Sequence, residues 1–188
     1  MVYAALADSD EDLRQAPIKV LEDWAKLYDG DLLVLLPDTF GSTQFLAAAP
    51  DWAAGWAGAR PDSKPPIEAG EELLTWWEQR GSNPAEKRII LSDGMMIDSI
   101  ESAMRHFRGR AKVSIGWGTN LTNDFSGCWP SRYEARYKAP SIVCKVVEAE
   151  GRPAVKLSDN PGKFLGPPEE IARYERVFIY RRGKPRPA

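Results

Sequence analysis

Small polar and acidic residues follow four apolar, strand-like runs in this chain of 188 residues. Carboxylates accept hydrogen bonds from sugar hydroxyls and bind Mg²⁺, while arginine and the backbone N–H groups of glycines can approach phosphate oxygens. The combination predicts a site for a phosphorylated sugar with a divalent ion. Its residues, in the order of the four runs, are Asp38; Arg60, Asp62 and Ser63; Ser92, Asp93 and Gly94; and Gly116, Gly118 and Thr119.

Taken singly, several of these residues also have a structural interpretation. Asp38 and Asp93 could be helix caps, and Gly116 and Gly118 could allow close backbone packing at a strand end. Their recurrence after successive runs is what favours a ligand site. The only histidine, His106, lies within an amphipathic helical pattern and is predicted to be a surface or boundary residue, so no Ser/His/Asp constellation can be built around it.

Strand-like and helical patterns alternate between residues 31 and 118. Apolar runs predict strands over 31–38, 56–63, 87–93 and 111–118. Helical spacing predicts helices over 10–27, 39–49, 66–80 and 95–107, with Thr39 as a candidate N-cap and with Trp76 and Trp77 in packing positions. This alternation indicates parallel βαβ units, in which the carboxyl ends of all the strands share one rim.

The pattern changes after Thr119. Residues 128–140 form a polar loop, and residues 141–159 read as two strands of an antiparallel hairpin around the turn "EAEGRP". A helix is predicted over 169–180, followed by a basic tail. Two regions are therefore expected, one over residues 1–126 that carries the rim and one over residues 127–188.

The composition excludes several classes of partner and location. With 43% hydrophobic and 28% charged residues and a formal net charge of −2, the chain has no bulk electrostatic reason to bind nucleic acid or an anionic membrane. No run approaches the roughly 18 apolar residues of a membrane span. Two isolated cysteines, Cys128 and Cys144, indicate neither a disulfide framework nor a zinc site, and a cytoplasmic location is expected.

Five motifs resemble the carboxyl-terminal half of the nicotinate phosphoribosyltransferases. They are "LPDTFGSTQFL", "GARPDS", "ILSDGMMID", "SIGWGTNLTNDF" and "VKLSDNPGK", and the resemblance extends from about Asp10 to Arg176. It implies the formation of nicotinate mononucleotide and pyrophosphate from nicotinate and phosphoribosyl pyrophosphate, aided by ATP hydrolysis, in NAD salvage. The implied fold is α/β: a partial, half irregular β/α barrel of the phosphoribosyltransferase type with a carboxyl-terminal antiparallel hairpin and helix.

The resemblance also implies roles for the rim residues. It assigns the ribose and pyrophosphate contact to Arg60, Asp62 and Ser63, the next rim loop to Ser92, Asp93 and Gly94, and a cradle for the 5′-phosphate to Gly116, Gly118 and Thr119. Asp38 becomes a supporting rim residue, and Asp62 and Asp93 become candidate ligands of Mg²⁺.

Two departures from the family pattern stand out. Lys64, Pro65 and Pro66 occupy the positions of a family Gly-Asp-Pro, a change that either alters pyrophosphate or Mg²⁺ binding or lets Lys64 supply a positive charge to the phosphates. The family's phosphorylated histidine, in a T-H-x-x-E motif, would lie ahead of Met1, where "MVYAALAD" resembles the helix that follows it. The chain is thus expected to hold the phosphoribosyl pyrophosphate rim but not the ATP-coupling histidine, the nicotinate-binding residues or the amino-terminal domain.

Four parallel strands make about half a barrel and leave strand edges and apolar faces uncovered. We expect the chain to pair with a polypeptide that supplies the other half or with another copy in a homo-oligomer, or to be a truncation product. Three hypotheses for its function follow. They are a part of the enzyme that is inactive alone, a non-catalytic remnant or partner subunit that binds phosphoribosyl compounds, and an unrelated α/β barrel fragment that binds sugar phosphates.

Overall fold

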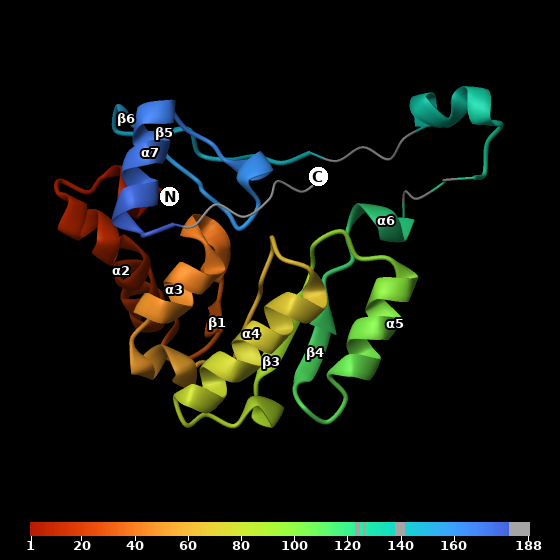
Figure 1. Ribbon diagram of the computed structural model, residues 1–188, viewed down its shortest axis with the longest axis horizontal. Helices are drawn as coiled ribbons and strands as arrows, with labels where there is room; N and C mark the ends of the chain where they lie inside the picture. Colours follow the sequence, from red (N-terminus) through yellow and green to blue (C-terminus); the bar gives the residue numbers. More distant parts are fainter. Residues whose placement is uncertain (123–124, 126, 138–141, 181–188) are drawn as a thin grey trace.

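Four short strands form one parallel sheet in the computed structural model, which describes residues 1–122, 125, 127–137 and 142–180 (Figure 1). Their order in the sheet, β1-β2-β3-β4, is also their order in the sequence. All neighbouring pairs are parallel, so the four carboxyl ends meet at one rim, as predicted. The bounds are Val34–Leu35 (β1), Gly58–Ala59 (β2), Arg88–Leu91 (β3) and Lys112–Ile115 (β4).

Helices follow or precede each strand. The α-helices are Val2–Ala5 (α1), Asp10–Tyr28 (α2), Ser42–Ala48 (α3), Pro66–Gln79 (α4), Ile97–His106 (α5), Thr119–Thr122 (α6) and Pro168–Val177 (α7). Short 3-10 segments are Pro37–Phe40 (η1), Asp51–Gly55 (η2), Pro84–Glu86 (η3), Ser131–Tyr137 (η4) and Pro161–Lys163 (η5). The helices predicted over 10–27, 66–80 and 95–107 are confirmed within a few residues.

Local chemistry explains where two of the long helices begin. The Ser9 side chain accepts a hydrogen bond from the Asp12 N–H at 3.0 Å, and an acidic first turn complements the positive end of α2. Helix α4 starts at Pro66, whose fixed φ suits the first helical position and whose missing N–H costs nothing there.

Four of the sequence predictions need correction, one of them the strand over 56–63, which shrinks to Gly58–Ala59. The strand over 31–38 shrinks to two residues because Leu32 has a positive φ of 53° and Pro37 opens η1. The helix over 39–49 begins at Ser42, since Thr39 lies inside η1 and Gly41, at φ 102°, separates the two. The loop over 128–140 contains η4, and its last residues, like the basic tail, lie outside the described residues.

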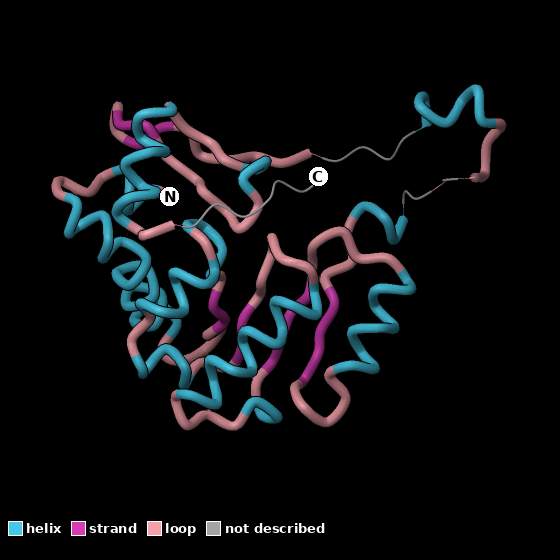
Figure 2. The backbone as a smooth tube through the Cα atoms, viewed as in Figure 1, coloured by secondary structure: helices cyan, strands magenta, loops and turns pink. Residues whose placement is uncertain are grey.

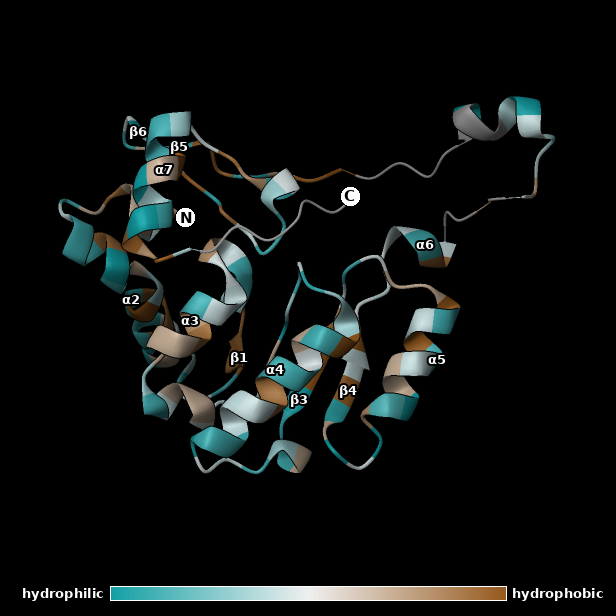
Figure 3. Cartoon of the chain, viewed as in Figure 1, coloured by the Kyte–Doolittle hydropathy of each residue, from teal (hydrophilic) through white to brown (hydrophobic). Residues whose placement is uncertain are grey.

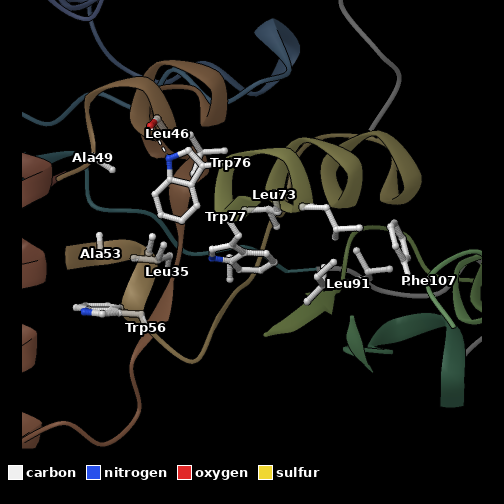
Figure 4. Close-up of a cluster of buried hydrophobic side chains, with 14 of the residues drawn as sticks. Leu35, Leu46, Ala49, Ala53, Trp56, Leu73, Trp76, Trp77, Leu91 and Phe107 are labelled. Carbon is white, nitrogen blue, oxygen red and sulfur yellow. Dashed lines mark hydrogen bonds between the residues drawn. The ribbon is translucent and has the colours of Figure 1, made fainter. Parts of the chain in front are cut away.

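The main core lies between the sheet and helices α3, α4 and α5 (Figure 4). Trp77 and Phe107 are completely buried, and Trp76 is 4% exposed and donates its indole N–H to the Leu46 carbonyl at 2.7 Å. The predicted packing role of both tryptophans is confirmed. Ile89 and Leu91 of β3 face this core while Arg88 is exposed, as the two-residue period of a strand requires.

Helix α4 depends on the absence of a side chain at Gly70. A Cβ atom there would lie 2.2 Å from Cζ of the buried Phe107 ring. Alanine favours helix over glycine by roughly 1 kcal/mol, but overpacking a core costs about 1–3 kcal/mol. We expect Gly70→Ala to lower the free energy of unfolding by about 1–2 kcal/mol, measured by urea denaturation. Thr75→Ala, on an exposed position of α4, is the control; a Gly70→Ala protein as stable as the original would show that Phe107 moves aside freely.

A second buried cluster joins the amino-terminal helices to the carboxyl-terminal region. Its members are Ala4, Leu13, Ala16, Phe40, Val155, Leu157, Tyr174 and Val177. The rings of Phe40 and Phe178 stack with their centroids 4.5 Å apart. Residues 154–166, here called the return segment, therefore run back from the hairpin toward the sheet and are held there by apolar contacts.

The carboxyl-terminal hairpin is confirmed but short. Strand β5, Glu148–Ala149, pairs antiparallel with β6, Arg152–Pro153, and residue 141 lies outside the described part. The α/β class, with a parallel sheet and an antiparallel hairpin, is thus confirmed, whereas closure into a barrel stays a prediction. Cys128 and Cys144 are exposed and free, and no helix within the described ranges is both long and apolar enough to cross a membrane.

Candidate functional site

Three predicted residues meet where β2 and β3 end. Arg60 Nη2 donates to Asp62 Oδ1 at 2.6 Å, and Arg60 Nε donates to Ser92 Oγ at 3.0 Å. The Ser92 hydroxyl in turn donates to Asp62 Oδ1 at 3.0 Å. This triangle of contacts fixes a guanidinium, a carboxylate and a hydroxyl on the rim, each partly open to solvent.

The Asp62 carboxyl is held in its ionised form. Partial burial by itself would raise its pKa, but the hydrogen bond and charge of Arg60, the Ser92 hydroxyl and the charge of Lys156 together lower the pKa below its usual value. The group therefore remains an anion, and a hydrogen-bond acceptor, at every pH above its usual titration range.

The return segment brings two lysines to the rim. Lys156 Nζ donates to Asp38 Oδ2 at 3.2 Å, and Lys163 Nζ donates to Asp93 Oδ1 at 3.3 Å. Figure 2 shows the carboxyl-terminal region on the side of the sheet toward which the carboxyl ends of the magenta strands point. Asp38 is only 4% exposed, so its ion pair with Lys156 is a buried one. Each rim carboxylate thus has a cation beside it.

Asp159 attaches the return segment to the sheet. Its carboxylate accepts hydrogen bonds from the Ser42 N–H at 2.7 Å, the Ser42 hydroxyl at 2.6 Å and the Ser63 hydroxyl at 2.8 Å. The Asp159 N–H also donates to Ser63 Oγ at 3.2 Å, and the side chain is 7% exposed. We call this set the Asp159 latch. Ser63, predicted as a ligand contact, has its hydroxyl committed to the latch.

The Lys64 ammonium pairs with residues other than the rim carboxylates Asp38, Asp62 and Asp93. Its ammonium donates to Thr43 Oγ1 at 2.8 Å and to Glu72 Oε2 at 2.5 Å, and it lies 4.0 Å from Asp159 Oδ1. The side chain is 11% exposed. The residue that departs from the family pattern therefore joins the loop after β2 to helices α3 and α4, and the positive charge at Asp38, Asp62 and Asp93 comes from other residues.

The glycines at the rim differ in their surroundings. A Cβ atom at Gly116 would lie 2.7 Å from Cβ of Ser92, so only glycine lets the end of β4 approach the end of β3 this closely. A Cβ at Gly118 would meet nothing within 4 Å, and this exposed residue leads into Thr119 at the start of α6. Packing accounts for Gly116, whereas it places no such demand on Gly118. Gly94, after β3, has a positive φ of 58° that favours glycine.

The sequence-based list of site residues missed Lys156, Asp159 and Lys163. Their partners on the rim are distant in the sequence: 70 residues separate Asp93 from Lys163, and 117 separate Ser42 from Asp159. No local pattern predicts such contacts. The signal in the sequence is the motif "VKLSDNPGK", which contains all three residues.

The predicted Mg²⁺ ligands do not form a cage made of protein alone. Among the residues that the structure describes, no three His, Cys, Asp or Glu side chains are grouped as a metal site. Asp62 is bound to Arg60 and Asp93 to Lys163. Mg²⁺ commonly keeps several waters and binds through one or two carboxylates plus substrate phosphates. Asp62 and Asp93 are therefore candidates for such a shared role only, each offering one carboxylate.

His106 lies apart from the rim network, in a surface cluster that joins α4 to the end of α5. Its Nε2 is 2.6 Å from Glu71 Oε1, and Arg110 donates to both Glu71 oxygens at 2.5 and 2.9 Å. The His106 side chain is 38% exposed, which confirms the predicted boundary position. The hydrogen bond from Arg110, followed by that involving His106, lowers the pKa of Glu71 to about 2.

This cluster predicts a pH-dependent contribution to stability. Because unfolding returns the Glu71 pKa toward its ordinary value of 4.5, the stabilisation is present above that pH and is lost as the pH falls toward 2. Solvent screening of the exposed partners limits it to below about 1 kcal/mol. We expect Glu71→Gln to lower the urea midpoint near neutral pH, with the difference shrinking as the pH approaches 3 or so. The exposed Glu22→Gln is the control; a difference independent of pH would contradict the assignment.

Comparison with known proteins gives a consistent result. A model of the nicotinate phosphoribosyltransferase (NAPRTase) family matches residues 2–181. A nicotinate phosphoribosyltransferase from Vibrio cholerae is 33% identical, with a TM-score of 0.85 over 97% of this chain and 43% of its own. One from Porphyromonas gingivalis is 30% identical, with a TM-score of 0.80 over 95% of this chain and 46% of its own.

A putative nicotinate phosphoribosyltransferase from Saccharomyces cerevisiae is 26% identical, with a TM-score of 0.77 over 96% of this chain and 44% of its own. The chain thus spans somewhat less than half the length of each of these three proteins. The match covers the strands, the rim and the return segment alike. On these grounds the chain belongs to the nicotinate phosphoribosyltransferase family.

Proposed function

We propose that this chain supplies the phosphoribosyl pyrophosphate site of a nicotinate phosphoribosyltransferase. The reaction joins nicotinate to the ribose of phosphoribosyl pyrophosphate and releases pyrophosphate, giving nicotinate mononucleotide. The observation that carries the proposal is the convergence of Arg60, Asp62 and Ser92 with two lysines of the return segment. Family membership supports the same reaction.

The rim residues suit the two parts of this substrate. Carboxylates such as Asp62 accept hydrogen bonds from ribose hydroxyls, and Arg60, Lys156 and Lys163 offer donors to phosphate oxygens. As nicotinate nitrogen bonds to the anomeric carbon, the bond from that carbon to pyrophosphate oxygen breaks and negative charge grows on the leaving group. Cations held in place before the reaction stabilise that charge.

Mg²⁺ enters the proposal as part of the substrate complex. Phosphoribosyl pyrophosphate would otherwise bring several negative charges toward Asp62 and Asp93. Asp62 or Asp93 would hold an Mg²⁺ ion whose positive charge would offset this repulsion. With the substrate bound, Lys156 and Lys163 would donate to phosphate oxygens, and their hydrogen bonds to Asp38 and Asp93 would weaken.

We assign ATP coupling and nicotinate recognition to the part of such an enzyme that lies outside the matched length. The related proteins are more than twice as long as the matched part, and the single histidine of this chain is engaged with Glu71 away from the rim. We propose that the complete site forms only when this chain is joined to the remaining part of such an enzyme. Release of pyrophosphate by the chain alone, on addition of nicotinate, would contradict this proposal.

The binding part of the proposal can be tested on the isolated chain by titration calorimetry. We expect heat from phosphoribosyl pyrophosphate in the presence of Mg²⁺, weaker heat without Mg²⁺, and a loss of roughly tenfold or more in affinity for Lys156→Met, because a charge-assisted hydrogen bond contributes about 1.5–3 kcal/mol. Lys26→Met, at a side chain 76% exposed on α2, is the matched control. Equal binding by Lys156→Met, or no binding by the unaltered chain, would overturn the assignment.

A further inference from the structure

The loop that carries Asp62, residues 61–64, has little backbone bonding of its own. Backbone hydrogen bonds end at the Arg60 N–H, which donates to the Leu35 carbonyl at 2.8 Å, and resume in the first turn of α4. Between these points, no backbone hydrogen bond joins residues 61–64 to any other described residue. Pro61, at the start of the loop, has no N–H to donate. The position of this segment, here called the Asp62 loop, therefore depends on its side chains.

Lys64 anchors the end of the Asp62 loop in a small polar triangle. Its ammonium donates to Glu72 Oε2 at 2.5 Å and to Thr43 Oγ1 at 2.8 Å, and the Thr43 hydroxyl donates to Glu72 Oε1 at 2.5 Å. The side chains of Lys64 and Glu72 are 11% and 25% exposed, so salt screens this pair less than a surface pair. Figure 3 shows hydrophilic and hydrophobic residues intermixed along α4; Glu72 is one of the former, next to the buried Leu73.

The Lys64 ammonium faces two carboxylates at once. Besides Glu72, the Asp159 carboxylate of the latch lies 4.0 Å from it and is 7% exposed. Moving the ammonium to a substrate phosphate would leave both carboxylates without this cation, and a buried charge that loses its partner is strongly destabilising. Ser63, the neighbouring residue, donates its hydroxyl to Asp159 at 2.8 Å. This end of the loop is thus bound to other parts of the protein, and Asp62 lies between it and the end of β2.

We propose that Lys64 is a positioning residue, which ties the Asp62 loop to α3 and α4 and so holds the Asp62 carboxylate ready for phosphoribosyl pyrophosphate without contacting this substrate. The identity of the ligand rests on the proposed function. A carboxylate that is already held in its binding geometry loses less conformational entropy when the ligand binds. Without the anchor, the loop would sample other positions, and the contacts of Asp62 with Arg60 and Ser92 would be made only part of the time.

Two substitutions that change the charge in opposite directions test this role. Lys64→Met and Glu72→Met break the same pair, but one removes a positive charge and the other a negative charge. We expect both to weaken the binding of phosphoribosyl pyrophosphate with Mg²⁺ to the intact chain by roughly tenfold, measured by titration calorimetry. A direct contact between Lys64 and a phosphate predicts a different pattern, because Glu72→Met would free the ammonium and strengthen the binding of an anion.

A second measurement needs no ligand and therefore separates this proposal from the proposed function. In both variants, the backbone ¹⁵N order parameters of Asp62 and Ser63 should fall from about 0.85 toward about 0.6. Lys87→Met is the matched control, because this partly buried lysine donates to the Trp56 carbonyl at 2.9 Å just before β3, at the opposite end of that strand from the rim. It should change neither the affinity nor these order parameters.

Each outcome has a definite meaning. Unchanged order parameters in Lys64→Met and Glu72→Met would overturn the positioning role, and so would tighter binding by Glu72→Met. If the unaltered chain binds no phosphoribosyl pyrophosphate, the proposed function fails and the order parameters alone decide whether Lys64 holds the loop. Circular dichroism should show that each variant folds. If Lys64→Met does not fold, Glu72→Met carries the test, since its side chain is the more exposed of the pair.

Discussion

Replacing Asp159 by alanine is expected to lower the free energy of unfolding by about 3 kcal/mol, because each buried hydrogen bond to a charged group contributes about 1.5–3 kcal/mol and the bonds share partners. The substitution removes the acceptor of the Ser42 N–H and of the hydroxyls of Ser42 and Ser63. These donors would remain buried, since both serines are at most 4% exposed. The return segment would then be held to the rim by apolar contacts, by the two lysine–aspartate pairs and by the backbone bonds of Leu157 and Ser158 to the Thr39 carbonyl.

Two measurements separate this latch from an ordinary buried contact. Urea denaturation gives the stability loss, and hydrogen exchange should show faster exchange at residues 156–163 than in α4. Asp159→Asn, which keeps the shape but presents an amide to three donors, should lose less than alanine does. Asp31→Ala, at an exposed aspartate, is the control and should change stability by less than roughly 0.5 kcal/mol. Unchanged exchange in the return segment of Asp159→Ala would show that its other contacts hold it without the latch.

Asp62→Asn is expected to weaken the binding of phosphoribosyl pyrophosphate with Mg²⁺ by about 100-fold, equivalent to about 2.7 kcal/mol. Three effects combine. The carboxylate that accepts from ribose hydroxyls becomes neutral, a ligand for Mg²⁺ is lost, and Arg60 and Ser92 lose the charged acceptor that orients them. The fold should be unaffected because the Asp62 side chain is 34% exposed.

The pKa of Asp62 adds a second, independent expectation. Since the folded protein holds this pKa below its usual value, the carboxylate stays ionised as the pH falls from 7 to about 5. Affinity measured by calorimetry over that range should therefore not decline through protonation of Asp62. Asp98→Asn, on an exposed position of α5, is the matched control. Equal affinity in Asp62→Asn and the unaltered chain would remove Asp62 from the site.

Much of the sheet and part of the site could be predicted from the sequence. Apolar runs and helical spacing identify β3 and α4 because these elements bury one regular face, and parallel pairing then places Asp62 and Asp93 on the same rim. The start of α3 was predicted wrongly because the N–H of Ser42 is capped by Asp159, a residue far along the chain. A local pattern carries no information about a cap of this kind.

The role of Lys64 illustrates the same limit. From the sequence, a lysine two residues after Asp62 could either bind substrate phosphates or form contacts within the protein. Its contacts with Thr43 and Glu72 depend on how α3 and α4 sit against the sheet, which only the folded chain defines. The packing role of Gly116 also became evident only once the position of Ser92 was known.

The wide sequence separation of the Asp159 latch has a consequence for the order of folding. Neighbouring strands of the sheet are consecutive in the sequence, so their contacts close short loops and can form early. The latch must close a loop of 117 residues, from Ser42 to Asp159, and loop-closure entropy places that step late. During synthesis, the sheet can therefore form before the ribosome has released the return segment. The lysines that complete the anion site arrive last, so in an unfinished chain Asp38 and Asp93 lack their cations while Asp62 already has Arg60.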